Sequence, residues 1–190
     1  MHTIEPFYLW ENLYNSSEDE RSPFYDKQYN LYECTNTVYN YYIHPLWDEF
    51  GSSTLYIKIL YVDYAKHFAI LEFIGEWNDC LHNDIMFLKR NVIETLIESG
   101  IKKFILIGEN IMNFHYSDDS YYQEWLEEIE GGWIVAIGFR QHVIDEFLNG
   151  LIHYYIYLYD EINSITWIKY HPYKLFALIE TYLSKLLIER

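Results

Sequence analysis

Basic residues are scarce in this sequence. Lys and Arg together number 13, against 29 Asp and Glu, and the formal charge is −16. Proteins that bind nucleic acid without sequence preference need a basic surface to displace the counterions around phosphate groups. Anionic membrane surfaces attract basic segments by the same electrostatics. We therefore expect neither nucleic acid nor a membrane as partner, whereas a basic or amphipathic protein is compatible with this charge.

Cysteine is equally scarce. Cys34 and Cys80 form no CxxC pair, and their spacing fits no zinc pattern. The first ten residues lack the basic and apolar regions of a signal peptide, and no apolar run is long enough to span a membrane. These absences favour a cytoplasmic protein with reduced thiols, and we expect no bound metal.

Motifs that identify common chemistries are also missing. The sequence contains no HExxH, and neither Gly108-Glu109-Asn110 nor Gly131-Gly132 completes a GxGxxG or Walker pattern. We therefore expect no cofactor and no catalytic residues, and we favour a binding protein over an enzyme.

Aromatic residues, by contrast, are abundant at 20% of the chain, with 21 Tyr, 11 Phe and 6 Trp. Residues 1–51 are aromatic and polar without a sustained period, and we interpret them as an extension packed on an α/β domain of residues 52–190. Exposed aromatic side chains promote aggregation. We therefore expect five of them to pack on the main domain or on a second subunit: Tyr25, Tyr32, Tyr39, Tyr41 and Trp47.

Buried-strand patterns alternate with helical patterns after residue 52. Two consecutive runs rich in β-branched and aromatic residues predict a hairpin, and later runs that are continuously apolar are typical of strands covered on both faces. The predicted strands cover residues 54–62, 67–74, 104–107, 133–137 and 152–158.

Helical periodicity fills the intervals between these strands. One apolar stripe runs Leu81, Ile85, Leu88, Val92 and Leu96, with Gly100 where a helix C-cap glycine belongs. After a predicted loop over 108–119, Ser120 and Gln123 form a capping-box pattern that opens a second helix. A third helix is predicted over 140–148, with Leu148 on its inner side, and a terminal helix begins at Pro172. The fold class is therefore α/β, with a mixed, mostly parallel sheet that carries helices.

This order of elements resembles the STAS domains of anti-sigma-factor antagonists over roughly residues 54–190. Phe73-Ile74-Gly75-Glu76 is similar to the family's apolar strand that ends in Gly-Glu, and residues 143–159 are similar to its short helix, Gly-Leu and apolar strand. The resemblance implies a bacterial regulatory protein that binds other proteins. The family's Asp-Ser phosphorylation motif is absent, although Ser117 and Ser120 lie in the matching region, so the resemblance does not carry the phosphoswitch.

An acidic, aromatic segment gives the most distinctive predicted surface. No Lys or Arg occurs between Phe104 and Phe139. Acidic residues beside aromatic anchors suit the docking of a basic or amphipathic protein, although a solvated helix face has the same composition. The predicted partner-binding residues are Phe114, His115, Tyr116, Asp118, Asp119, Tyr121, Glu124 and Trp125.

Two other functions stay open. In an open α/β sheet, ligands bind beyond the carboxyl ends of the strands, where carboxylates and histidines could hold a metal or perform acid–base chemistry. The residues of this alternative pocket are Glu76, Asp79, Glu109, Asn110, His115, Arg140 and His142. The aromatic extension could also form a dimer interface in a structural protein, and a homodimer is left open.

Overall fold

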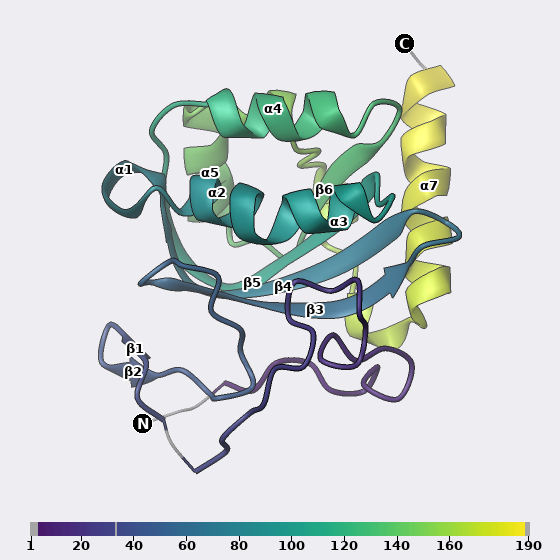
Figure 1. The fold of residues 1–190 in the computed structure, drawn as a ribbon. Coiled ribbons are helices and arrows are strands. Elements are labelled where there is room, and N and C mark those ends of the chain that lie inside the picture. The colour runs from purple at the N-terminus through teal and green to yellow at the C-terminus, as the bar shows by residue number, and fades with distance from the viewer. Residues whose placement is uncertain (1–3, 33, 189–190) are drawn as a thin grey trace.

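A four-stranded sheet forms the centre of the protein. The computed structural model describes residues 4–32 and 34–188. The strands, β3 (Leu55–Asp63), β4 (Phe68–Asn78), β5 (Lys103–His115) and β6 (Trp133–Ile137), lie side by side in that order. β3 and β4 are antiparallel, whereas β4, β5 and β6 are parallel. The predicted α/β class with a mixed, mostly parallel sheet is confirmed (Figure 1).

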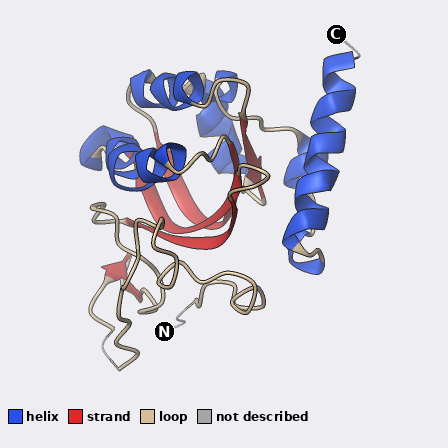
Figure 2. Ribbon diagram, turned by 45° about the vertical axis from the view of Figure 1, so that its right-hand side comes forward, coloured by secondary structure: helices blue, strands red, loops and turns tan. Residues whose placement is uncertain are grey.

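Helices and irregular segments cover both faces of this sheet (Figure 2). Within the described part of the chain, no helix is both long and apolar enough to cross a membrane. The helices are α1 (Asp79–His82), α2 (Asp84–Leu88), α3 (Glu94–Glu98), α4 (Ser120–Glu128), α5 (Gln141–Asn149), α6 (Asp160–Asn163) and α7 (Pro172–Ile188), with a π-helical turn at Lys89–Ile93 and 3-10 turns at Ile152–Tyr154 and Trp167–Lys169.

The two central strands are apolar on both faces, as the continuous runs predict. Phe104 and Leu106 point towards the layer of α2, α3, α4 and α5. Ile105 and Ile107 point the other way, towards α7. All four side chains are fully buried, as are those of residues 134–137 in β6. Successive residues of a strand alternate between faces, so a strand covered on both sides has to be apolar throughout.

The predicted helix after β4 is interrupted. α1 is a single turn that ends where Asn83 adopts a left-handed conformation (φ 55°), and α2 starts anew at Asp84. Because α1 is detached from the helix that follows, Leu81 is exposed and its predicted place in the core is wrong. The other four members of the stripe are buried. Gly100 follows the last turn with φ +93°, as a helix C-cap glycine should.

The predicted loop over 108–119 is mostly strand. β5 continues to His115 because two irregularities in its pairing with β4 adjust the register, so that Asn78 pairs with His115. The Ser120–Gln123 capping box does not form: Ser120 hydrogen-bonds Asp118, and Gln123 donates to Glu127.

The predicted strand 152–158 is wrong. A 3-10 turn replaces the first half of this predicted strand. The second half contacts the sheet through a single β-bridge between Tyr157 and Val135. Leu148 is exposed rather than turned inward, since the inner face of α5 is filled by Val143, Ile144 and Phe147.

The extension lies against β3 and β4 and contains a small hairpin, β1 (Thr37–Val38) and β2 (Tyr41–Tyr42) (Figure 1). Trp47 is buried against Tyr56 and Ile74 of the sheet, as predicted. Tyr32 is 98% exposed, and Tyr25, Tyr39 and Tyr41 are about half exposed. The prediction that Tyr25 and Tyr32 pack on the main domain is therefore wrong. Tyr39 and Tyr41 contact that domain with only part of their surface, through the Tyr39 hydroxyl and through a hollow that Tyr41 lines with Ile74. Packing on a second subunit stays a prediction.

Candidate functional site

The carboxyl ends of β4 and β5 meet at one edge of the sheet, and Glu76 is the centre of a polar cluster there. Its carboxylate accepts hydrogen bonds from Asn78 (2.7 Å) and from the Tyr39 hydroxyl at the tip of the β1–β2 hairpin. His115 Nε2 lies 3.4 Å from Glu76 Oε1, and Asn113 donates to the Tyr39 hydroxyl at 3.1 Å. The cluster therefore attaches the hairpin of the extension to the strand ends.

A hollow of about 370 Å³ adjoins this cluster. α1 forms one wall with Cys80 and Leu81, and the end of β5 forms another with His115 and Tyr116. Glu146 of α5 completes the lining beside Glu76 and Asn78. Two residues of the predicted alternative pocket, Glu76 and His115, thus come together here.

The other residues of the alternative pocket lie elsewhere. Glu109 accepts a hydrogen bond from Trp167 (2.8 Å) beside the α7 layer. His142 Nε2 is 2.7 Å from the carbonyl oxygen of Met112. Arg140 lines a separate hollow with Tyr41 and Met112. Asn110 is half-buried within β5.

Asp79 is a buried structural anchor. Its carboxylate accepts hydrogen bonds from Trp77 Nε1 (3.0 Å), the Ile85 amide (2.8 Å) and the Tyr122 hydroxyl (2.7 Å). Burial raises the pKa of Asp79 to about 7, against the opposing effect of these donors. The side chain links β4, α2 and α4, and it is too enclosed to contact a substrate.

Two of the predicted docking aromatics are core residues. Phe114 stacks on Phe147 with ring centroids 4.0 Å apart, and Trp125 packs edge-on against Phe104 at 5.1 Å. Phe114 turns inward because β5 extends through the predicted loop, and Trp125 lies on the same inner face of α4 as Tyr122. Their prediction as exposed anchors is therefore wrong.

Cations from another part of the chain neutralise much of the acidic face of α4. Arg90 makes a bidentate pair with Glu124, at 2.8 and 3.0 Å. The fully buried ammonium of Lys89 lies 2.7 Å from Glu128, 3.2 Å from Glu94 and 3.7 Å from Glu124. These three carboxylates are close enough to hold a metal ion, but the Lys89 ammonium already lies among them. Residues 104–139 contain no Lys or Arg, so the positive charges that pair with α4 come from Lys89 and Arg90.

The predicted docking residues that stay exposed form a mixed apolar and acidic surface. His115, Tyr116 and Asp118 are exposed, while Tyr121 is half-buried and Asp119 accepts a hydrogen bond from Tyr155 at 2.5 Å. Tyr116 packs over Gly150, where an added Cβ would lie 2.7 Å from the ring. We define the carboxyl-edge surface as Leu81, His115, Tyr116, Asp118 and Leu151.

Leu81 and Leu151 are absent from the sequence prediction of this surface. Leu81 is 78% exposed and Leu151 is 50% exposed. The sequence places Leu81 in a helix stripe and Leu151 just before a predicted strand. The residues that break these elements have left-handed backbones, but they are Asn83 and Leu151 itself, not glycines. The sequence signal available was therefore weak.

No family model and no curated protein matches the chain. Among solved structures, the chain is similar to the anti-sigma factor antagonist SpoIIAA in its unphosphorylated form, with a TM-score of 0.41 and 12% identity over 55% of this chain and 90% of that chain. It is also similar to the Bacillus cell fate determinant SpoIIAA in its phosphorylated form, with a TM-score of 0.37 and 13% identity over 55% of this chain and 93% of that one. The resemblance noted in the sequence is thus found again among solved structures, and it concerns the fold alone.

Proposed function

We propose that this protein is a non-catalytic binding module whose carboxyl-edge surface accepts a basic, amphipathic segment of another protein. The observation that carries the proposal is the exposure of Leu81. This leucine is 78% exposed on a one-turn helix and lines the same hollow as Tyr116. Exposed apolar groups that gather at one place mark interaction sites more often than scattered ones do.

Charge supports the choice of a basic partner. Asp118 is exposed on this surface, and Glu146 lines the hollow together with Leu81 and Tyr116. The formal net charge of the chain is −16, and Lys89 and Arg90 already form ion pairs with carboxylates of α3 and α4. An amphipathic helix could place apolar side chains on Leu81 and Tyr116 while its Lys or Arg residues approach the acids at the rim.

The polar cluster at Glu76 favours a structural role over catalysis. Its carboxylate already accepts hydrogen bonds from Asn78 and Tyr39 and lies beside His115. These contacts come from the protein's own side chains and fix the orientation of the carboxylate within the cluster. The cluster fixes the strand ends and the hairpin that flank the surface.

The proposal is tested by mapping the binding of a designed basic amphipathic peptide of Leu and Lys onto the protein by NMR. A peptide with Glu in place of Lys is the matched control. We expect amide shifts to concentrate at residues 79–82, 114–119 and 148–152 with the basic peptide and to weaken as salt rises, because screening slows the encounter. Shifts spread over the whole protein, or equal shifts with the acidic peptide, would contradict the proposal.

A further inference from the structure

A cavity of about 100 Å³ lies between the extension and β3, away from the carboxyl-edge surface. The extension contributes its segment from Pro6 to Ser17, together with Tyr29 and Leu46, and β3 contributes residues 58–60. Phe7, Leu46 and Leu60 make part of the lining apolar. Engineered apolar cavities of about 150 Å³ hold benzene, so this space suits a ligand of a few heavy atoms rather than a large cofactor.

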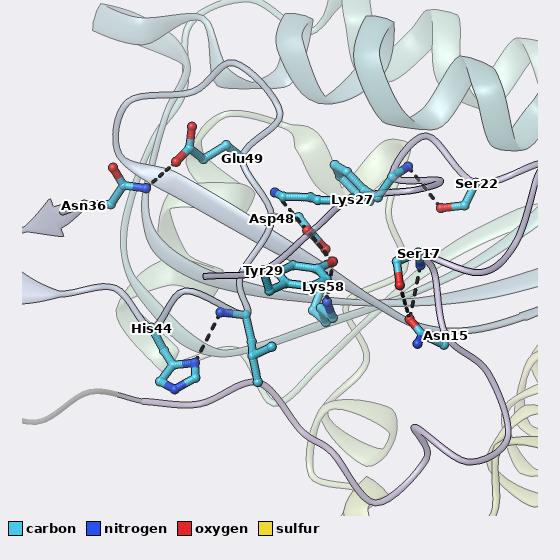
Figure 3. A network of polar contacts seen from close by, with 12 residues as sticks. Asn15, Ser17, Ser22, Lys27, Tyr29, Asn36, His44, Asp48, Glu49 and Lys58 are labelled. Atoms are coloured by element: carbon cyan, nitrogen blue, oxygen red, sulfur yellow. Dashed lines mark hydrogen bonds and ion pairs between the residues drawn. The ribbon is translucent and has the colours of Figure 1, made fainter. Parts of the chain in front are cut away.

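Two residues of the cavity lining, Tyr29 and Lys58, belong to a charged network (Figure 3). The buried carboxylate of Asp48 accepts a hydrogen bond from Tyr29 (2.8 Å) and pairs with Lys27 (3.0 Å) and Lys58 (3.3 Å). Lys58 also donates to the Tyr29 hydroxyl at 2.9 Å. The contacts of Lys58 with Asp48 and with Tyr29 use two of the three N–H donors of its ammonium group.

The charges of this network do not balance within it. Two ammonium groups, those of Lys27 and Lys58, face the single carboxylate of Asp48, which leaves one positive charge in a strongly acidic protein. Burial lowers the pKa of Lys58, against the opposing effect of Asp48. A further anion beside Lys58 would stabilise its charged form. Among the residues that line the cavity, Glu11 carries a carboxylate; this residue is exposed, and its charge opposes the effect of burial on the pKa of Lys58 less than Asp48 does.

Ser16 supplies a second polar group. Its side chain is 1% exposed and lines the cavity, and its Oγ makes no hydrogen bond of normal length and angle among the described residues, although it lies close enough to the Tyr29 hydroxyl to oppose the rise in the pKa of Tyr29 that burial causes. A buried hydroxyl without a partner loses the hydrogen bonds that it made to water, and natural structures rarely leave such a group unsatisfied. A ligand oxygen in the cavity would satisfy it.

We propose that this cavity binds a small organic monocarboxylate with a compact apolar body. The carboxylate would accept hydrogen bonds from the remaining N–H of Lys58 and from the Ser16 hydroxyl. The apolar body would lie against Phe7, Leu46 and Leu60. Because these residues come from both the extension and β3, the bound ligand would hold the extension against the sheet.

Isobutyrate is the probe for this site, because its branched aliphatic body is smaller than benzene. Isobutanol has a similar body without the charge, and acetate has the same head without the body. Ligand-observed NMR and calorimetry on the full chain should rank isobutyrate first, with a dissociation constant on the order of 1 mM. Lys58→Met should weaken isobutyrate binding roughly tenfold or more, since a charged hydrogen bond is lost. Ser16→Ala should weaken it about threefold.

Three further variants separate the ligand from the fold. Glu11→Gln should tighten isobutyrate binding roughly twofold to fivefold, because a like charge at the cavity is removed. Ser16→Leu should fill the cavity and abolish binding while the protein stays folded. Lys174→Met, an exposed lysine on α7, makes the same charge change as Lys58→Met and should leave binding unaltered.

The outcomes decide the proposal in either direction. Binding that is lost in Lys58→Met and Ser16→Leu but kept in Lys174→Met supports it. Absence of isobutyrate binding to the unmodified protein at about 10 mM, or binding that survives Ser16→Leu, would overturn it.

Discussion

The helical layer and the extension are attached to one sheet by different combinations of contacts. The layer of α2 to α5 packs through a continuous apolar cluster, in which Trp125 and Phe104 are fully buried. The extension combines apolar packing with a few polar anchors. Its buried apolar side chains are those of Trp10, Phe24, Val38, Ile43, Trp47 and Phe50. Asp48 is held by Lys27, Tyr29 and Lys58, and the Phe7 amide donates to Glu72 at 2.9 Å. Apolar packing is insensitive to pH, whereas polar anchors respond to charge. The layer also contains such an anchor, Asp79, within a large apolar cluster, so charge-changing substitutions should affect the extension more than the layer.

The largest effect should come from the apolar layer. Trp125→Ala should lower the free energy of unfolding by about 3–5 kcal/mol, as large-to-small core substitutions do. Trp125→Phe should cost far less, because no hydrogen-bond partner for the indole N–H is found among the described residues. Urea unfolding of both variants measures this. Equal, small losses would mean that Trp125 is not the core residue described here.

Breaking a polar anchor should affect the extension alone. Asp48→Leu leaves Lys27 and Lys58 without their buried partner, which should destabilise the extension by about 3 kcal/mol. Hydrogen exchange should then quicken over residues 24–50 and stay slow in β5 and β6, because local opening need not involve the whole domain. Uniform loss of protection across the sheet would show that the two regions unfold as one unit.

The pH response sharpens the comparison further. Burial raises the pKa of Glu72 from 4.5 in the unfolded chain to about 7 in the folded protein. The folded state therefore holds this proton more tightly, so the contribution of Glu72 to stability falls between pH 4.5 and 7 and is constant above pH 7.

Glu72→Gln removes this titration and keeps an oxygen for the Phe7 amide. The variant should match the unmodified protein near pH 4.5 and exceed it by about 2–3 kcal/mol above pH 7. Asp79, whose pKa is also raised to about 7, titrates in both proteins and cancels in the difference. An identical pH dependence of urea unfolding in both proteins would contradict this assignment.

The smallest effect concerns backbone strain at the carboxyl-edge surface. Leu151 has φ +59°, a conformation that is unfavourable for a leucine and free of cost for glycine. Leu151→Gly should raise the midpoint of thermal unfolding, by the equivalent of about 0.5–1 kcal/mol, while it weakens the binding of the basic peptide. A variant that is less stable would show that the exposed leucine contributes packing instead.

The sequence predicts the sheet well because its signal is local and redundant. The runs 104–107 and 133–137 are apolar at every position, and one face alone could not bury them. The hairpin of β3 and β4 is equally clear from its β-branched residues. By contrast, β5 continues to His115 because of register irregularities in its pairing with β4, and the amino-acid composition does not reveal these irregularities.

The candidate site is harder to predict because it depends on tertiary contacts. Lys89 and Arg90 neutralise α4 from more than thirty residues away in sequence, as the 34-residue separation of Arg90 and Glu124 illustrates. Leu81 fits a helix stripe by spacing, and a left-handed Asn83 separates it from the helix. Neither the pairing of α4 with Lys89 and Arg90 nor the break at Asn83 can be recognised from a single sequence.

A matched pair of leucine variants tests the proposed docking surface most directly. Leu81→Ser lies on the carboxyl-edge surface, and Leu13→Ser changes an exposed leucine of the extension. Titrated with the basic amphipathic peptide by fluorescence anisotropy, Leu81→Ser should bind roughly tenfold more weakly, as a residue at the centre of an interface does. Leu13→Ser should bind as the unmodified protein does. Equal affinity of Leu81→Ser and the unmodified protein would contradict the account.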